Sequence, residues 1–208
     1  MTIAKRATPR HAASLILYRK HTKGLEVLMG KRAKGHRFLP DVFVFPGGRV
    51  DPDDHLIPCS QPLRHDVEAR LSVPGDMAKA VACAAVRETF EETGLIIGDL
   101  AKDILIPDLS GLDYIARAIT PSESPIRFNT RFLIADAAQA KGELGGSGEL
   151  THLGWYGIEE ALNMPVVDVT EFVLEEIDYH FRSESERLSR FSNFTYLQGK
   201  SVIRRENI

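Results

Sequence analysis

Apolar and polar positions along the chain predict a series of strands. Two early apolar runs, Ala12–Tyr18 and Leu25–Met29, are separated by a glycine and predict two neighbouring, paired strands. A third run, Val42–Phe45, ends at Pro46-Gly47-Gly48, a tripeptide that predicts a tight turn rather than a continuing strand. Two later segments have the same strand-type pattern: Arg127–Ala135 and Leu150–Tyr156.

Three segments read as helical. Met77–Thr93 contains no Gly or Pro and is rich in Ala and Glu, which predicts a long helix closed by Gly94 at its C′ position. Val167–Phe181 predicts an amphipathic helix, and one helical turn is expected around Arg64–Leu71 within an otherwise polar, proline-containing loop. Strands that alternate with helices in this way predict an α/β or α+β layered fold.

Composition narrows the class of protein. The 208 residues, 43% hydrophobic and 26% charged, suit one globular domain with an elaboration, or at most two small domains. A net charge of -3 predicts no nucleic-acid or anionic-membrane partner, and no apolar run approaches the roughly 18–20 residues of a membrane span. No secretory signal is apparent, and Cys59 and Cys83 form no CxxC pair. We therefore expect a cytoplasmic protein without a disulfide framework or zinc site.

Candidate chemistry gathers on the predicted long helix. Glu88, Glu91 and Glu92 fall within a single arc of about 100°, at i, i+3 and i+4 spacing. Three such carboxylates repel one another unless a cation offsets their charge, and Mg²⁺ prefers oxygen ligands. Arg87, at the edge of the arc, is placed to hold one carboxylate by a bidentate contact. A solvated acidic helix end is the alternative. The opposite, core-facing side is expected to carry Cys83, Val86 and Phe90.

The second candidate segment is Phe45-Pro46-Gly47-Gly48, because paired glycines let backbone approach a ligand or helix end closely. A plain hairpin would use the same residues. Taken together, the two segments resemble the Nudix box. Arg87–Leu95 matches its second half, with Thr89 in an apolar slot, and Gly48 begins its first half. Asp54 stands where the family has Glu, and the spacing to Arg87 exceeds the usual one by about 25 residues, an insertion that a surface loop absorbs at little cost.

The resemblance implies a Nudix-type α/β/α sandwich with a mixed sheet, the box loop and helix, and an extra C-terminal helix. The Nudix hydrolase domain would cover residues 8–165, with the insertion at about 52–76, and a C-terminal helix and tail would pack on it over 166–208. The implied cofactor is Mg²⁺ or Mn²⁺, held by Glu88, Glu91 and Glu92. The implied catalytic residues are Arg87, Glu88 and Glu149, with Glu88, Glu143 and Glu149 as alternative general bases.

A motif before the box narrows the resemblance to the coenzyme A diphosphatase branch, of the peroxisomal type with an insertion in the box. That motif reads Leu-Leu-Thr-x-Arg-(Ser or Ala)-x3-Arg-x3-Gly-x3-Phe-Pro-Gly-Gly. Its spacing is kept here from Leu28 to Gly48, with Met29, Gly30 and Asp41 departing from it. The substrate-binding residues implied are Arg32, Arg37, Gly47 and Gly48. Arg32 and Arg37 could equally be ordinary surface residues. Arg127 and Arg131 form a second candidate pair for binding substrate. The peroxisomal address is not expected, since the C-terminus lacks Ser-Lys-Leu.

The expected function is therefore hydrolysis of a small nucleoside-diphosphate-linked substrate, with coenzyme A or acyl-coenzyme A as the best candidate. ADP-ribose, a dinucleotide or a nucleoside triphosphate is the nearest alternative, and a non-catalytic Nudix-fold binding module is the alternative from a different class. The tail over residues 182–208 is basic and aromatic, and it could form a dimer contact, act as a lid or pack against the domain. The sequence does not decide whether the protein is a homodimer.

Overall fold

A computed structural model of the chain describes residues 7–33, 35, 40–71, 77–182, 190–197 and 200–207. Across these residues, nine strands form one mixed sheet. Its order is β10 (Leu150–Gly157), β2 (Gly24–Arg32), β1 (Arg10–His21), β8 (Phe128–Asp136), β7 (Asp113–Ile119), β11 (Arg190–Leu197) and β12 (Lys200–Asn207), with β3 (Phe43–Val44) beside β2 and β4 (Gly47–Arg49) beside β1. The β1–β8 and β7–β11 pairs are parallel and the others antiparallel. A smaller sheet has the order β6 (Ile104–Pro107), β5 (Ile96–Ala101) and β9 (Ala140–Lys141).

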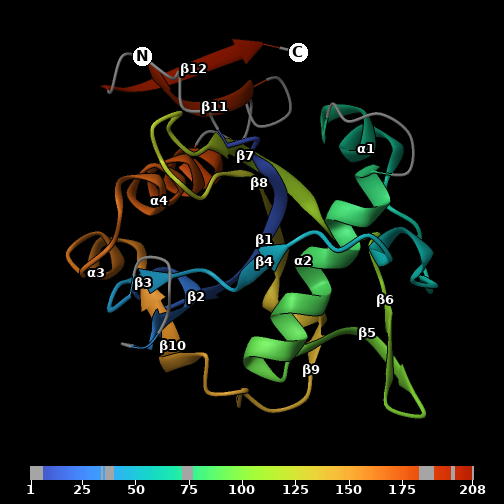
Figure 1. The fold of residues 1–208 in the computed structure, drawn as a ribbon. Helices are drawn as coiled ribbons and strands as arrows, with labels where there is room; N and C mark the ends of the chain where they lie inside the picture. The colour runs from blue at the N-terminus through green and yellow to red at the C-terminus, as the bar shows by residue number, and fades with distance from the viewer. Residues whose placement is uncertain are drawn as a thin grey trace.

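Helices cover both faces of the main sheet (Figure 1). One face carries α1 (His65–Leu71) and α2 (Met77–Thr93), and the other carries α3 (Ile158–Leu162) and α4 (Asp168–Arg182). Two short 3₁₀ helices, η1 (Asp54–Leu56) and η2 (Ala137–Gln139), lie in loops. Strand β1 supplies both cores, because Leu15 and Leu17 pack toward α2 while Ile16 between them packs toward α4. The expected α/β/α sandwich with a mixed sheet is confirmed.

The long helix is confirmed with the predicted bounds, Met77–Thr93. Gly94 follows it at φ +75° and donates its N–H to the Phe90 carbonyl at 2.8 Å, as expected of a C′ glycine. Cys83 and Val86 are buried as predicted, but the placement of Phe90 in the core was wrong, since it is only half-buried. The buried face runs instead through Thr89, whose hydroxyl donates to the Ala85 carbonyl at 2.8 Å and so tolerates burial.

The predicted tight turn at Pro46-Gly47-Gly48 was also wrong. The chain bends at Pro46 and then continues as strand β4, which pairs with β1. Gly47 has φ +152°, and a Cβ there would lie 2.5 Å from the Ala13 carbonyl oxygen. Glycine is therefore required at this position for β4 to approach β1 so closely.

The described part of the insertion, residues 52–71, packs onto α2. The expected helical turn is α1, whose Val67 and Leu71 are buried in the same core as α2. The Sγ atoms of Cys59, in the insertion, and Cys83, on α2, are 3.5 Å apart. Residues 72–76 lie outside the described chain.

The tail adds a hairpin to the sheet, a role that the sequence left open. Strands β11 and β12 pair with each other, and β11 lies beside β7. Glu176 of α4 is buried and holds the hairpin, accepting from Ser192 Oγ at 2.7 Å and from the Arg205 Nη2 at 3.0 Å. Every helix in the described residues is too short or too polar to span a bilayer.

Candidate active site

Arg87 is the centre of the charged cluster at the end of α2. Its Nε and Nη2 donate to both carboxylate oxygens of Asp54, at 2.9 and 3.1 Å, in a bidentate pair. Its Nη1 donates to Glu88 at 2.9 Å and to Glu91 at 3.2 Å, and its Nη2 also reaches the Arg49 carbonyl at 3.2 Å. Burial alone would lower the pKa of Arg87, but the Asp54 and Glu88 carboxylates raise it overall. The insertion thus leaves Asp54 in contact with the box helix, 33 positions before Arg87.

Glu92 is fixed by the glycine strand. Its Oε2 accepts the Gly47 N–H at 2.9 Å, and the residue is only 8% exposed. Burial raises the pKa of Glu92 to about 7; the Glu88 and Glu149 charges add to this rise, whereas the Gly47 N–H and the Arg32 charge oppose it. Glu92 therefore carries a proton on part of the molecules at neutral pH.

Glu88 lies against the neighbouring glycine. A Cβ on Gly48 would come within 2.4 Å of the Glu88 carboxylate carbon, so the missing side chain makes the space in which this carboxylate sits. Burial raises the pKa of Glu88, although the Arg87 charge acts in the opposite direction. In this structure both glycines contact box glutamates, and their expected role in binding substrate stays a prediction.

Arg32 and Glu149 approach the same carboxylates from the sheet side. Arg32 is the last residue of β2. Burial lowers the pKa of its guanidinium, whereas the Glu92 and Glu149 charges raise it. The Glu149 carbonyl accepts the Ala33 N–H at 3.2 Å, which places Glu149 beside Arg32. The glycine run before Glu149 packs on α2, since Gly145 N–H donates to the Thr93 carbonyl at 2.8 Å.

The remaining sequence candidates are placed differently. Arg37 lies outside the described residues. The second arginine pair bonds away from the box: Arg127 donates to the Ala7 carbonyl at 2.8 Å and Arg131 to the Leu71 carbonyl at 3.3 Å. The exposed Glu143 follows Gly142, and its carbonyl faces Gly94 at the end of α2.

The donor set fits a hard divalent cation in its chemistry. Glu88, Glu91 and Glu92 offer only carboxylate oxygens, and two of these groups are buried with raised pKa values, so a nearby cation would stabilise their charged forms. Within the described ranges, however, no three His, Cys, Asp or Glu side chains are arranged to hold a metal. Glu91 is 53% exposed and turned toward Arg87, so binding an ion requires at least one side chain to move.

The titration of Glu92 leads to a prediction for the metal-free protein. The pKa of Glu92 rises from an ordinary 4.5 to about 7 on folding. The protonated carboxyl therefore contributes fully to the free energy of unfolding below pH 4.5, and this contribution is lost as the pH rises through 7. We expect Glu92→Gln to be more stable than the parent at pH 8 by on the order of 3 kcal/mol, with a difference from this titration of only about 0.4 kcal/mol at pH 4.5.

Urea unfolding in EDTA at several pH values measures this difference. Glu175→Gln, which changes an exposed glutamate of α4, is the matched control and should follow the parent at every pH. Parallel stability profiles for the parent and Glu92→Gln would contradict the assignment of a raised pKa.

Comparison with known proteins gives one curated relative and several solved structures that are nudix proteins. No family model matches the chain. It is 32% identical over 151 residues to the Caenorhabditis elegans protein named nudix hydrolase 7, a match covering 60% of this chain and 43% of that protein. The chain therefore spans less than half the length of this curated relative.

The matches to solved structures cover more of the chain than the match to this relative. A NUDIX hydrolase from Alicyclobacillus acidocaldarius is 30% identical, with a TM-score of 0.63, over 81% of this chain and 90% of that one. The NUDIX domain of Shewanella oneidensis NrtR, complexed with ADP ribose, is 14% identical with a TM-score of 0.53 over 84% and 90% of the two chains, and shares the fold. Given the 30% identity over most of the Alicyclobacillus enzyme and the box residues gathered around Arg87, the chain belongs to the Nudix hydrolase family.

Proposed function

We propose that this protein is a metal-dependent pyrophosphohydrolase that cleaves the diphosphate of a nucleoside-diphosphate-linked substrate. One observation carries the proposal: Glu92 and Glu88 lie against Gly47 and Gly48, and Arg87 binds both Glu88 and Glu91. A solvated acidic helix end would leave all three carboxylates in water, whereas Glu88 and Glu92 are largely buried at a cost that a bound cation would offset.

Mg²⁺ or Mn²⁺ would be held by Glu88, Glu91 and Glu92, and the bound ion would polarise the phosphoryl oxygens and acidify an attacking water. Arg87 positions Glu88 and Glu91 rather than touching substrate, because its donors are already engaged by carboxylates and by a backbone carbonyl. Arg32, at the end of β2, would neutralise charge on the phosphate oxygens.

Glu149 is the general base that the geometry favours. It interacts electrostatically with both Arg32 and Glu92, while the Glu143 carbonyl faces Gly94 beyond the helix end. We expect Glu149→Gln to lower kcat about 10²-fold or more, as loss of a general base does, and Glu143→Gln to change it less than about threefold. Steady-state kinetics of the two variants measures this, and equal losses would remove the distinction.

Coenzyme A remains the proposed substrate, and two departures from its motif have structural reasons. Asp41 stands where the motif has Gly and adopts φ +65°, a left-handed conformation that Asp tolerates better than most residues. Gly30 stands where the motif has Thr, and a Cβ there would lie 2.8 Å from the Leu150 Cβ, so β10 packs where the Thr side chain would be. Both residues therefore suit the backbone and packing of this chain at the two positions.

A substrate panel tests the proposal. Purified protein with Mg²⁺ or Mn²⁺ should convert coenzyme A to 4′-phosphopantetheine and adenosine 3′,5′-bisphosphate, with slower turnover of ADP-ribose, dinucleotides and nucleoside triphosphates. Product identification by mass spectrometry distinguishes them. Faster hydrolysis of another panel member would reassign the substrate, and no hydrolysis of any would overturn the proposed activity.

A ligand-binding module without catalysis is the second candidate. It is favoured by the absence of a gathered three-residue metal cluster in the described residues and by the contact of two box glutamates with Arg87. Binding of ADP-ribose or coenzyme A that Glu91→Gln leaves unchanged, with no turnover at saturating Mn²⁺, would favour this candidate over the enzyme.

A further inference from the structure

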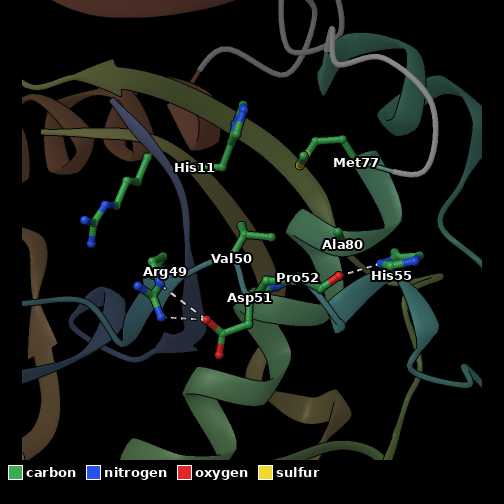
Figure 2. A pocket seen from close by; sticks show the side chains of 9 residues that line it. His11, Arg49, Val50, Asp51, Pro52, His55, Met77 and Ala80 are labelled. Atoms are coloured by element: carbon green, nitrogen blue, oxygen red, sulfur yellow. Dashed lines mark hydrogen bonds and ion pairs between the residues drawn. The ribbon is translucent and has the colours of Figure 1, made fainter. Parts of the chain in front are cut away.

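A cavity of about 690 Å³ opens beside the N-terminal half of α2, whereas the box glutamates lie near the other end of that helix. Its walls come from the start of β1, the loop after β4, η1 and α2. Figure 2 shows Arg49 and Asp51 on one side of it and Met77 and Ala80 on the other. We call it the distal pocket.

The rim of the distal pocket is basic. Arg10 and Arg49 are exposed side chains on its wall, and His11 and His55 add two imidazoles. Asp51 is the acid among the lining residues, and it accepts from the Arg49 Nη2 at 3.1 Å. The two guanidinium groups exceed this single carboxylate, so the pocket favours an anion.

A buried arginine adds to this charge from behind. Arg131 is 1% exposed and, among the described residues, forms no ion pair with a carboxylate. Its Nη1 lies 3.1 Å from His11 Nδ1, and it faces Arg117 across the β7–β8 pair. A buried, unneutralised guanidinium is costly, and an anion in the adjacent pocket would reduce that cost.

The contact with Arg131 also determines which ring nitrogen of His11 carries the proton. A guanidinium can only donate, so His11 Nδ1 accepts and the ring proton lies on Nε2, available to an anion. Burial lowers the pKa of His11, and the charges of Arg131 and Arg117 lower it further, which favours the neutral ring.

The floor of the distal pocket is apolar. Val50, Met77 and Ala80 line it and offer a surface on which a planar ring can pack. Ala80 precedes Glu88 by eight residues on the same helix, which places the floor about 12 Å from the box glutamates along the helix axis. One nucleoside diphosphate derivative can span that separation.

We propose that the distal pocket binds the phosphorylated nucleoside end of the substrate and recognises a phosphate that is not part of the cleaved diphosphate. This rests on the proposed function and deepens it. Planar guanidinium groups match phosphate oxygens, and the apolar floor accounts for a base, whereas a simple carboxylate ligand would use only the rim.

Binding to the metal-free protein tests this without any turnover. Calorimetric titration with adenosine 3′,5′-bisphosphate should show binding about tenfold tighter than with adenosine 5′-monophosphate, which lacks the second phosphate. Arg10→Met and Arg49→Met should each weaken the bisphosphate about tenfold. Arg182→Met, which removes a 73% exposed arginine at the end of α4, should leave its affinity unchanged.

The outcomes separate this inference from the proposed hydrolysis. Tight, arginine-dependent binding in a protein that hydrolyses nothing would support the distal pocket while overturning the enzyme. In an active protein, Arg10→Met should lower the ratio of kcat/KM for coenzyme A to that for dephospho-coenzyme A about tenfold. Equal affinities of parent, Arg10→Met and Arg49→Met for the bisphosphate, with all three folded by circular dichroism, would overturn the distal pocket.

Discussion

Replacing Glu88 with glutamine is expected to lower turnover about 10³-fold while the protein stays folded. Glutamine has nearly the same shape, so it fits the space beside Gly48 and can still accept from Arg87. It lacks the negative charge that a divalent ion requires. Steady-state kinetics at saturating Mn²⁺ and thermal unfolding of the same samples measure the two effects separately.

The geometry offers a second way to disturb the same carboxylate. Gly48→Ala would place a Cβ 2.4 Å from the Glu88 carboxylate carbon and force that group to move. Because both changes act on one carboxylate, the double variant should lose little more activity than Glu88→Gln alone. Glu175→Gln on the exposed side of α4 is the control. Turnover of Glu88→Gln within threefold of the parent would mean that Glu88 has no catalytic role.

Replacing Arg87 with methionine is expected to have the largest effect on stability, about 3–5 kcal/mol, or a fall of about 10 °C in Tm. Asp54 is 2% exposed and would lose its bidentate partner while remaining buried and charged. Differential scanning calorimetry of the metal-free protein measures the loss. Adding Asp54→Asn to Arg87→Met should recover part of it, because the uncompensated charge is removed.

Arg182→Met is the matched control for this prediction. Arg182 is 73% exposed and pairs with Asp178 one turn earlier on α4, so its loss should cost less than about 0.5 kcal/mol. A loss below about 1 kcal/mol for Arg87→Met would contradict the view that Arg87 holds the insertion, through Asp54, to the box helix.

Several elements were readable from the sequence because their signals are local. Helix α2, strands β1 and β2 and helix α4 all follow from the spacing of apolar residues and from glycine at helix ends or between strands. The arc that carries Glu88, Glu91 and Glu92 follows from helix geometry alone. For the same reason the family could be recognised from a short box, although 25 extra residues interrupt it.

Other strands escaped prediction because their pattern depends on distant neighbours. Strand β7 carries the charged Arg117, opposite the buried Arg131 of β8, between buried apolar residues, and this charge interrupts its apolar run. In the tail, Ser192 and Phe194 face inward from β11 at alternate positions. This period of two was the sequence signal that could have predicted the strand. Ser192 is buried only because Glu176, 16 residues earlier on α4, accepts its hydroxyl.

The sequence by itself determined the residue types of the box, their shared helical face and the layered fold, because side-chain periodicity is a property of each segment. Only the tertiary structure decided which partners those residues meet. Asp54 reaches Arg87, Gly47 binds Glu92, and Arg131 lies behind His11 through contacts 33, 45 and 120 positions apart in the chain. Contacts at such separations depend on how the strands are ordered in the sheet. The burial of these site residues and the balance of charge around them follow from that order.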